Sequence, residues 1–124
     1  MILLTINSNN LFPRWFYLGQ NYPNPFSENT SIKFCVAYKS KVRLEVLDTD
    51  GHIIKTLLEE IKEAGTYELK IYASFFLSYK RQKKEASKQG VKEEIYLYKL
   101  KASPIGGRAG SYECEKIMRV IKLI

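Results

Sequence analysis

His52 is the only histidine of the chain, and it follows Asp48, Asp50 and Gly51. Carboxylates that alternate before a glycine are typical of the first part of a calcium-binding loop, but the later ligands of such a loop are missing. No serine or cysteine with a nucleophile signature stands at a spacing that would make the histidine catalytic. The pattern therefore predicts a turn, since aspartate favours the start of a turn and glycine accepts a positive φ.

The two cysteines, Cys35 and Cys114, are the remaining candidates for metal or redox chemistry. They do not form a CxxC pair, and a chain with a single histidine lacks the ligands of a zinc site. A disulfide between them and a buried or half-exposed free thiol at each position are both reasonable. We find no paired acid and base, metal cluster or phosphate loop, so we expect a protein that is not an enzyme and needs no cofactor.

Basic residues exceed acidic ones, twenty against thirteen, which gives a net charge of +7. Many of them lie between residues 79 and 94, where we expect a loop or a short exposed helix. This lysine-rich segment is either a solvated loop or a weak binding site for a polyanion. The basic residues that would form such a partner surface are Lys80, Arg81, Lys83, Lys84 and Lys88.

Six runs rich in apolar residues, several of them alternating with polar ones, lie at about 32–38, 42–47, 52–58, 66–71, 95–101 and 112–123. Alternation with period two, interrupted by turn residues, is typical of half-buried strands in a sandwich or barrel. We therefore expect an all-β, antiparallel β-sandwich of about six to seven strands with the lysine-rich segment inserted. The side chains expected to meet between its two layers are Ile32, Phe34, Leu44, Val46, Leu69 and Leu97.

Residues 1–17 are predicted to be an aromatic leader or linker, and residues 18–124 the sandwich. Trp15, Phe16 and Tyr17 either pack on the domain or present a surface to a partner, because aromatic side chains concentrate binding energy in interfaces. The apolar start of the chain lacks the basic residues of a signal peptide. No stretch approaches the roughly 18 apolar residues of a membrane-spanning helix.

The segment from Asn21 to Phe26 contains two prolines, each of which fixes its own φ and favours extended geometry in the residue before it. We expect a stiff, polyproline-like arm that ends at Phe26. It is either a rigid start of the first strand with Phe26 plugging the sandwich, or a recognition surface. The residues of this motif are Asn21, Tyr22, Pro23, Asn24, Pro25 and Phe26.

This motif and the blocks that follow it in order resemble the C-terminal sorting domain of bacterial type IX secretion cargo. The matching blocks, within about residues 18–124, are 18–26, 30–34, 42–48, 51–57, 64–67, 95–100 and 115–118. The resemblance implies an immunoglobulin-like sandwich, similar to a domain of the flagellar hook-capping protein. It also implies a non-enzymatic module that directs secreted proteins through the outer membrane or holds them at the cell surface.

The partner implied by this resemblance is a protein, either the secretion machinery or a neighbouring subunit, and the implied location is secreted or at the cell surface. Two other functions are expected alternatives. The chain would be a structural accessory subunit of a larger complex, joined through its sheet edges, or a polyanion-binding module.

Overall fold

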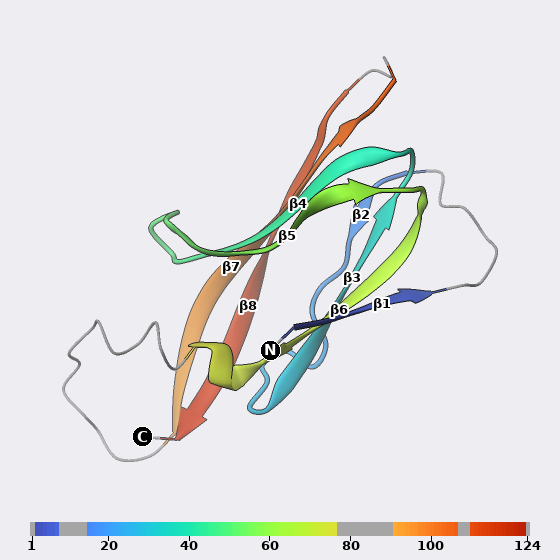
Figure 1. Ribbon diagram of the computed structural model, residues 1–124. Coiled ribbons are helices and arrows are strands. Elements are labelled where there is room, and N and C mark those ends of the chain that lie inside the picture. Colours follow the sequence, from blue (N-terminus) through green and yellow to red (C-terminus); the bar gives the residue numbers. More distant parts are fainter. Residues whose placement is uncertain (1, 8–14, 77–90, 107–109, 124) are drawn as a thin grey trace.

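The computed structural model describes residues 2–7, 15–76, 91–106 and 110–123 (Figure 1). Strands make up most of this part of the chain, and a short 3-10 helix, η1 (Ala73–Phe76), follows the sixth strand. The strands are β1 (Ile2–Asn7), β2 (Tyr17–Leu18), β3 (Asn29–Val36), β4 (Ser40–Leu47), β5 (Ile53–Lys62), β6 (Gly65–Tyr72), β7 (Val91–Pro104) and β8 (Tyr112–Leu123). Among the described residues, no helix is long and apolar enough to cross a membrane.

The strands form two four-stranded sheets that face each other (Figure 1). The first sheet has the order β1-β6-β3-β2, and the second has the order β5-β4-β7-β8. Every strand ladder in both sheets is antiparallel. The expected all-β antiparallel sandwich is therefore confirmed, and its six expected strands correspond to β3 through β8.

The first sheet extends into the segment that we expected to be a leader. β1 pairs along its whole length with β6, from Ile2 opposite Ile71 to Asn7 opposite Thr66. The apolar residues at alternate positions of β1 stand opposite residues of β6 that are buried in the core. The first sheet therefore includes residues that precede residue 18, within the segment expected to be a leader.

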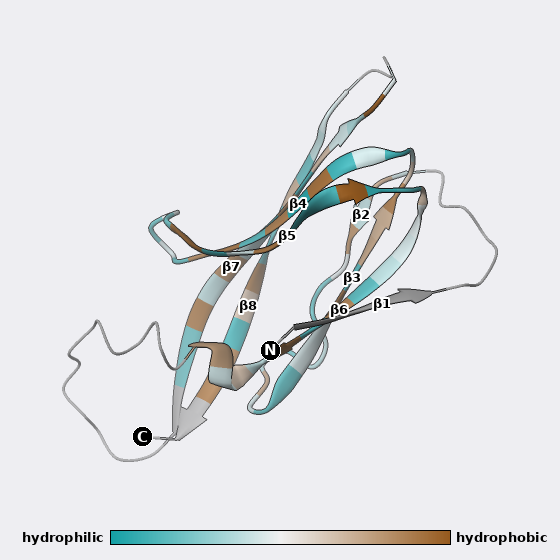
Figure 2. Ribbon diagram, in the orientation of Figure 1, coloured by the Kyte–Doolittle hydropathy of each residue, from teal (hydrophilic) through white to brown (hydrophobic). Residues whose placement is uncertain are grey.

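The core lies between the two sheets and contains five of the six side chains predicted to meet there: Ile32, Phe34, Leu44, Val46 and Leu69. The prediction for Leu97 is wrong. On β7 the inward positions belong to Tyr96, Tyr98 and Leu100, so Leu97 lies on the outer face and is half-buried. Around Leu97 both faces of this strand carry apolar residues, and the sequence alone could not show that the tyrosine rings fill the interior. Figure 2 shows the alternation of hydrophobic and hydrophilic residues along β7 and β8.

β7 begins earlier than expected. Glu93 and Glu94 were predicted to belong to the loop or helix of the lysine-rich segment, but they pair with Ile121 and Val120 of β8. The long partner strand supplies backbone groups for this extension, and these outweigh the low strand propensity of glutamate. Residues 79–90 of the lysine-rich segment lie outside the described part of the chain.

Truncation of the core is expected to be costly. Leu44 is fully buried at the centre of β4, so Leu44→Ala should lower the free energy of unfolding by about 2–5 kcal/mol. Ile61 on the neighbouring strand β5 is 57% exposed, so Ile61→Ala should change it by less than about 0.5 kcal/mol. Urea unfolding of the two variants measures the difference. Equal losses would contradict the assignment of Leu44 to the core.

Candidate recognition site

The segment from Gly19 to Phe26 closes one side of the sandwich. Along the first sheet it continues β2 and pairs with β3. The N–H of Gly19 donates to the carbonyl of Lys33 at 2.8 Å, and Tyr22 and Ser31 exchange two backbone hydrogen bonds of 2.9 Å each. These bonds occupy the edge of β3 beyond the short strand β2.

The same segment also binds the edge of the second sheet, at β8. The side chain of Gln20 donates to the carbonyl of Ile117 at 2.6 Å, and the N–H of Arg119 donates to Oδ1 of Asn24 at 2.8 Å. The backbone of Phe26 then donates to the carbonyl of Arg119 at 3.1 Å and accepts from the N–H of Ile121 at 2.7 Å. The motif therefore joins the two sheets at their edges.

A buried hydrogen-bond network holds the middle of the segment. The hydroxyl of Tyr98 accepts from the N–H of Asn21 at 2.7 Å and donates to the carbonyl of Gly19 at 2.8 Å. The side-chain amide of Asn21 donates to Oγ1 of Thr30 at 3.0 Å and to the carbonyl of Pro23 at 3.2 Å. The hydroxyl of Thr30 donates to the same carbonyl at 2.8 Å. Polar groups buried in this way are stable only when they are paired, so the network fixes one path of the backbone.

The expected polyproline-like arm is not what the structure shows. The segment bends between Tyr22, which pairs with Ser31 of β3, and Phe26, which pairs with Val120 of β8. The peptide bonds before Pro23 and Pro25 are both cis. The side-chain bonds of Asn21 and Asn24 determine this shape, and no local propensity in the sequence specified their partners. The other expectation for the segment is confirmed. Phe26 is buried, and its ring centroid lies 6.3 Å from that of Phe76.

The motif residues thus divide into two groups. Asn21 and Phe26 are buried and Asn24 is half-buried, so these three hold the segment in place. Tyr22, Pro23 and Pro25 are exposed, and Tyr22 reaches 81%. Only the second group is available to a partner.

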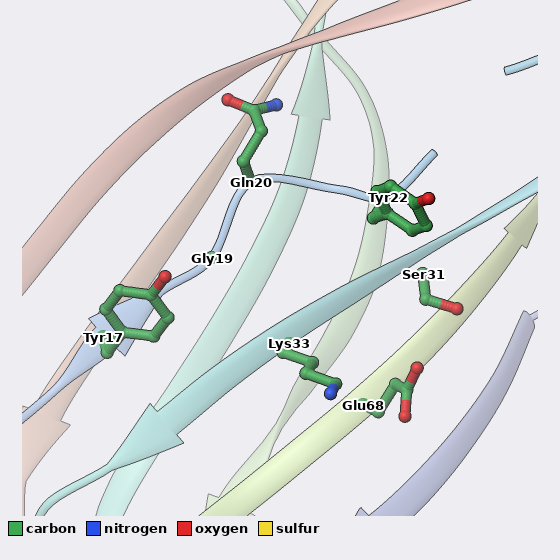
Figure 3. A pocket seen from close by; sticks show the side chains of 7 residues that line it. All are labelled: Tyr17, Gly19, Gln20, Tyr22, Ser31, Lys33 and Glu68. Carbon is green, nitrogen blue, oxygen red and sulfur yellow. The ribbon is translucent and has the colours of Figure 1, made fainter. Parts of the chain in front are cut away.

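A cleft of about 360 Å³ opens beside Tyr22 on the outer face of the first sheet (Figure 3). Two tyrosines, Tyr17 and Tyr22, stand at its two ends, and Lys33 and Glu68 lie side by side as register partners of β3 and β6 (Figure 3). Its lining residues are Tyr17, Gly19, Gln20, Tyr22, Ser31, Lys33 and Glu68.

Gly19 lines the cleft at a point where the segment lies close to β3. A Cβ at this position would lie 3.1 Å from the carbonyl oxygen of Lys33 and 3.2 Å from the ring of Tyr17. A side chain would therefore force the ring or the backbone to move. Sequence reasoning did not find Gly19, Lys33, Glu68 or Tyr98 as site residues, because they become neighbours only when the segment folds across β3 and β7.

The three leader aromatics have different environments. Trp15 is 70% exposed and Tyr17 is 51% exposed, so both are available as parts of a partner surface. Phe16 instead packs on the domain, with its ring 5.6 Å from that of Tyr112 and 6.0 Å from that of Tyr38. The basic partner surface proposed from the sequence, from Lys80 to Lys88, lies outside the described residues.

The residues that could hold a metal form the turn that the sequence predicted. Oδ1 of Asp48 accepts from the N–H groups of Asp50 and His52 at 3.0 and 2.9 Å, and its Oδ2 lies 3.2 Å from Nδ1 of His52. Gly51 has a φ of 90°, as a glycine in such a turn requires. Potential ligand atoms of Asp48, Asp50 and His52 lie within 4.8 Å of one another, but the Asp48 carboxylate already satisfies the turn.

Both cysteines are free and half-buried, which resolves the alternatives left open by the sequence in favour of thiols. The Sγ of Cys35 lies 3.5 Å from the hydroxyl of Thr66 on the first sheet. Cys114 lies beside Tyr112 on the second sheet. Burial and a hydrogen bond with Cys114 raise the pKa of Tyr112 to about 12.

The chain was compared with protein-family models and with the curated proteins, and neither comparison gives a match.

The network around Tyr98 predicts a specific loss of stability. Tyr98→Phe leaves the N–H of Asn21 and the carbonyl of Gly19 without a partner in a buried place, which should lower the free energy of unfolding by about 1–3 kcal/mol. Tyr22→Phe removes the same hydroxyl from an exposed ring and should change it by less than about 0.5 kcal/mol. Chemical unfolding of both variants provides the measurement. A loss at Tyr98 no larger than that at Tyr22 would show that the network does not hold the segment.

Alkaline pH should lower the stability of the fold through the hydroxyl of Tyr98. Burial raises the pKa of Tyr98 well above its usual value of 10.0. A tyrosine whose pKa is higher in the folded than in the unfolded state contributes stability at pH values below its unfolded-state pKa. This contribution is lost as the pH rises from the unfolded-state pKa toward the folded-state pKa. The free energy of unfolding should therefore fall more steeply between about pH 9 and pH 11 in the unaltered protein than in Tyr98→Phe. Parallel slopes in the two proteins would refute this role of Tyr98.

Proposed function

We propose that the chain is a non-enzymatic sorting or surface-association module, recognised by a protein partner through the exposed part of the motif. The observation that carries this proposal is that Tyr22 is 81% exposed on a backbone that is fixed on both sides. The resemblance of residues 18–124 to type IX sorting domains supplies the class of function. A partner of that class is either the secretion machinery or a neighbouring subunit at the cell surface.

The geometry favours recognition at this place for an energetic reason. Binding by a flexible loop loses affinity because the loop must be ordered, whereas a segment already held by hydrogen bonds to β3, β7 and β8 avoids most of that cost. Tyr22 and Tyr17 provide large aromatic surfaces with few rotatable bonds, which are frequent anchors in interfaces. The cleft between them offers a concave surface for one side chain of the partner.

The accessory-subunit function would use strand addition at a sheet edge, and the described edges differ in how open they are. The edge of β8 is occupied by Gln20, Asn24 and Phe26. The ten-residue edge strand β5 carries two register shifts against β4, and such bulges oppose the addition of a further strand. Polyanion binding by the lysine-rich segment stays a prediction from the sequence.

A reporter assay tests the proposed function. The full chain is fused to the C-terminus of an exported reporter and produced in a host with a working type IX system, and we expect the reporter at the cell surface. Tyr22→Ser should lower the surface fraction about tenfold, which corresponds to about 1.4 kcal/mol of lost binding.

Ile61→Ser is the matched control, because it also removes an exposed large side chain, but from the other sheet. It should leave the surface fraction unchanged. Retention of the unaltered fusion in the periplasm would refute the sorting function. Equal effects of the two substitutions would refute recognition through Tyr22.

A further inference from the structure

The outer face of the second sheet carries a row of aliphatic side chains that crosses all four strands. The strand registers place Ile53 of β5 opposite Leu47 of β4, Leu47 opposite Leu97 of β7, and Leu97 opposite Ile117 of β8. We call these four residues the aliphatic row. Ile53 and Ile117, at the two ends of the row, are 51% and 49% exposed, Leu97 is half-buried, and Leu47 is buried at 5%. Ile95, beside the row on β7, is 45% exposed, so the exposed apolar surface lies mainly on β7 and β8. An exposed apolar patch of this kind is typical of an interaction surface.

The charged residues around the row balance one another. By register, the outward positions of this face hold five acidic and five basic side chains: Glu45, Glu59, Glu93, Glu113 and Glu115, and Lys41, Arg43, Lys99, Lys101 and Arg119. Several are paired within the face, such as Arg43 with Glu45 at 2.8 Å and Lys99 with Glu113 at 3.3 Å. The chain as a whole has a net charge of +7, so this face is neutral on a basic protein. A neutral face favours contact with another copy and offers little attraction to a polyanion.

The charges beside the row are also complementary to themselves. Glu115 and Arg119 lie two residues to either side of Ile117 on β8, so all three side chains point outward. A two-fold axis parallel to the aliphatic row would bring the row of one copy onto the row of a second copy. The same rotation reverses the strand direction, so Glu115 of each copy would lie opposite Arg119 of the other. Both side chains are exposed, and Arg119 is 3.6 Å from Glu93 within its own chain.

We propose that a second copy of this chain packs on the aliphatic row and forms a two-fold symmetric dimer with two Glu115–Arg119 ion pairs between the copies. This inference goes beyond the proposed function, does not depend on it, and uses the sheet opposite the cleft. β4 ends and β5 begins at the row, so the rotation brings mainly β7 and β8 of the two copies together, and these cover about 400 Å² on each copy. The total of about 800 Å² is below the usual range for a specific interface, so the dimer should be weak, with a dissociation constant in the high micromolar range.

Sedimentation velocity on the purified full chain tests the dimer, over about 10 µM to 1 mM protein. The sedimentation coefficient should rise with concentration, and Ile117→Asp should raise the dissociation constant by at least about tenfold. Ile61→Asp is the matched control, since it places the same charge at an exposed isoleucine on the outer face of the same sheet. Urea unfolding checks that both variants remain folded. A chain that stays monomeric throughout, or equal weakening by both substitutions, overturns the proposal.

A mixing experiment separates contact with a second copy from any other association. Glu115→Arg alone and Arg119→Glu alone should each raise the dissociation constant at least about tenfold, because each places like charges opposite each other across the axis. Mixing the two variants should restore association to within about threefold of the unaltered protein, because every introduced charge then meets an opposite one. A mixture that associates no better than its components overturns the proposed arrangement.

Discussion

The structure depends on the closure of one side of the sandwich by residues 19–26. Two stacked sheets leave unpaired backbone groups along their edges, and here one segment satisfies groups of β3 and of β8 together. The hydroxyl of Tyr98 reaches from β7 to the backbone of this segment, and Phe26 fills the space behind it. The hydrogen bonds and the buried ring act on the same few residues, so the loss of one should loosen the others.

This closure explains why one short motif supports both a structural and a recognition function. Asn21 and Phe26 point inward and determine the path of the backbone, while Tyr22 points into solvent from a fixed position. The strand-start and recognition interpretations of the motif are therefore compatible, because they concern different residues. The cleft adds a concave surface only because Gly19 lets the segment lie close to β3.

The two sheets present outer faces of different character. The first carries the tyrosine-lined cleft, and the second carries an aliphatic row within a balanced set of charges. The charged part of the second face also contains Glu45, which is almost completely buried, with Arg43 at 2.8 Å and Lys101 at 3.7 Å. A carboxylate in such a place needs its cationic partners, and their side chains cover it and keep that half of the face polar. In the apolar half, Ile53, Ile95 and Ile117 remain about half exposed.

The sequence by itself determined the fold class, the six strands β3 to β8, the turn at Gly51 and the burial of Phe26, because alternation and turn residues are local signals. It could not decide which face of β7 points inward, since Leu97 and Tyr98 are both compatible with a core. It also could not find the Asn21–Tyr98 contact, the cleft or the aliphatic row. Those features join residues that are distant in the chain, and only the packing of the two sheets and the register of their strands bring them together.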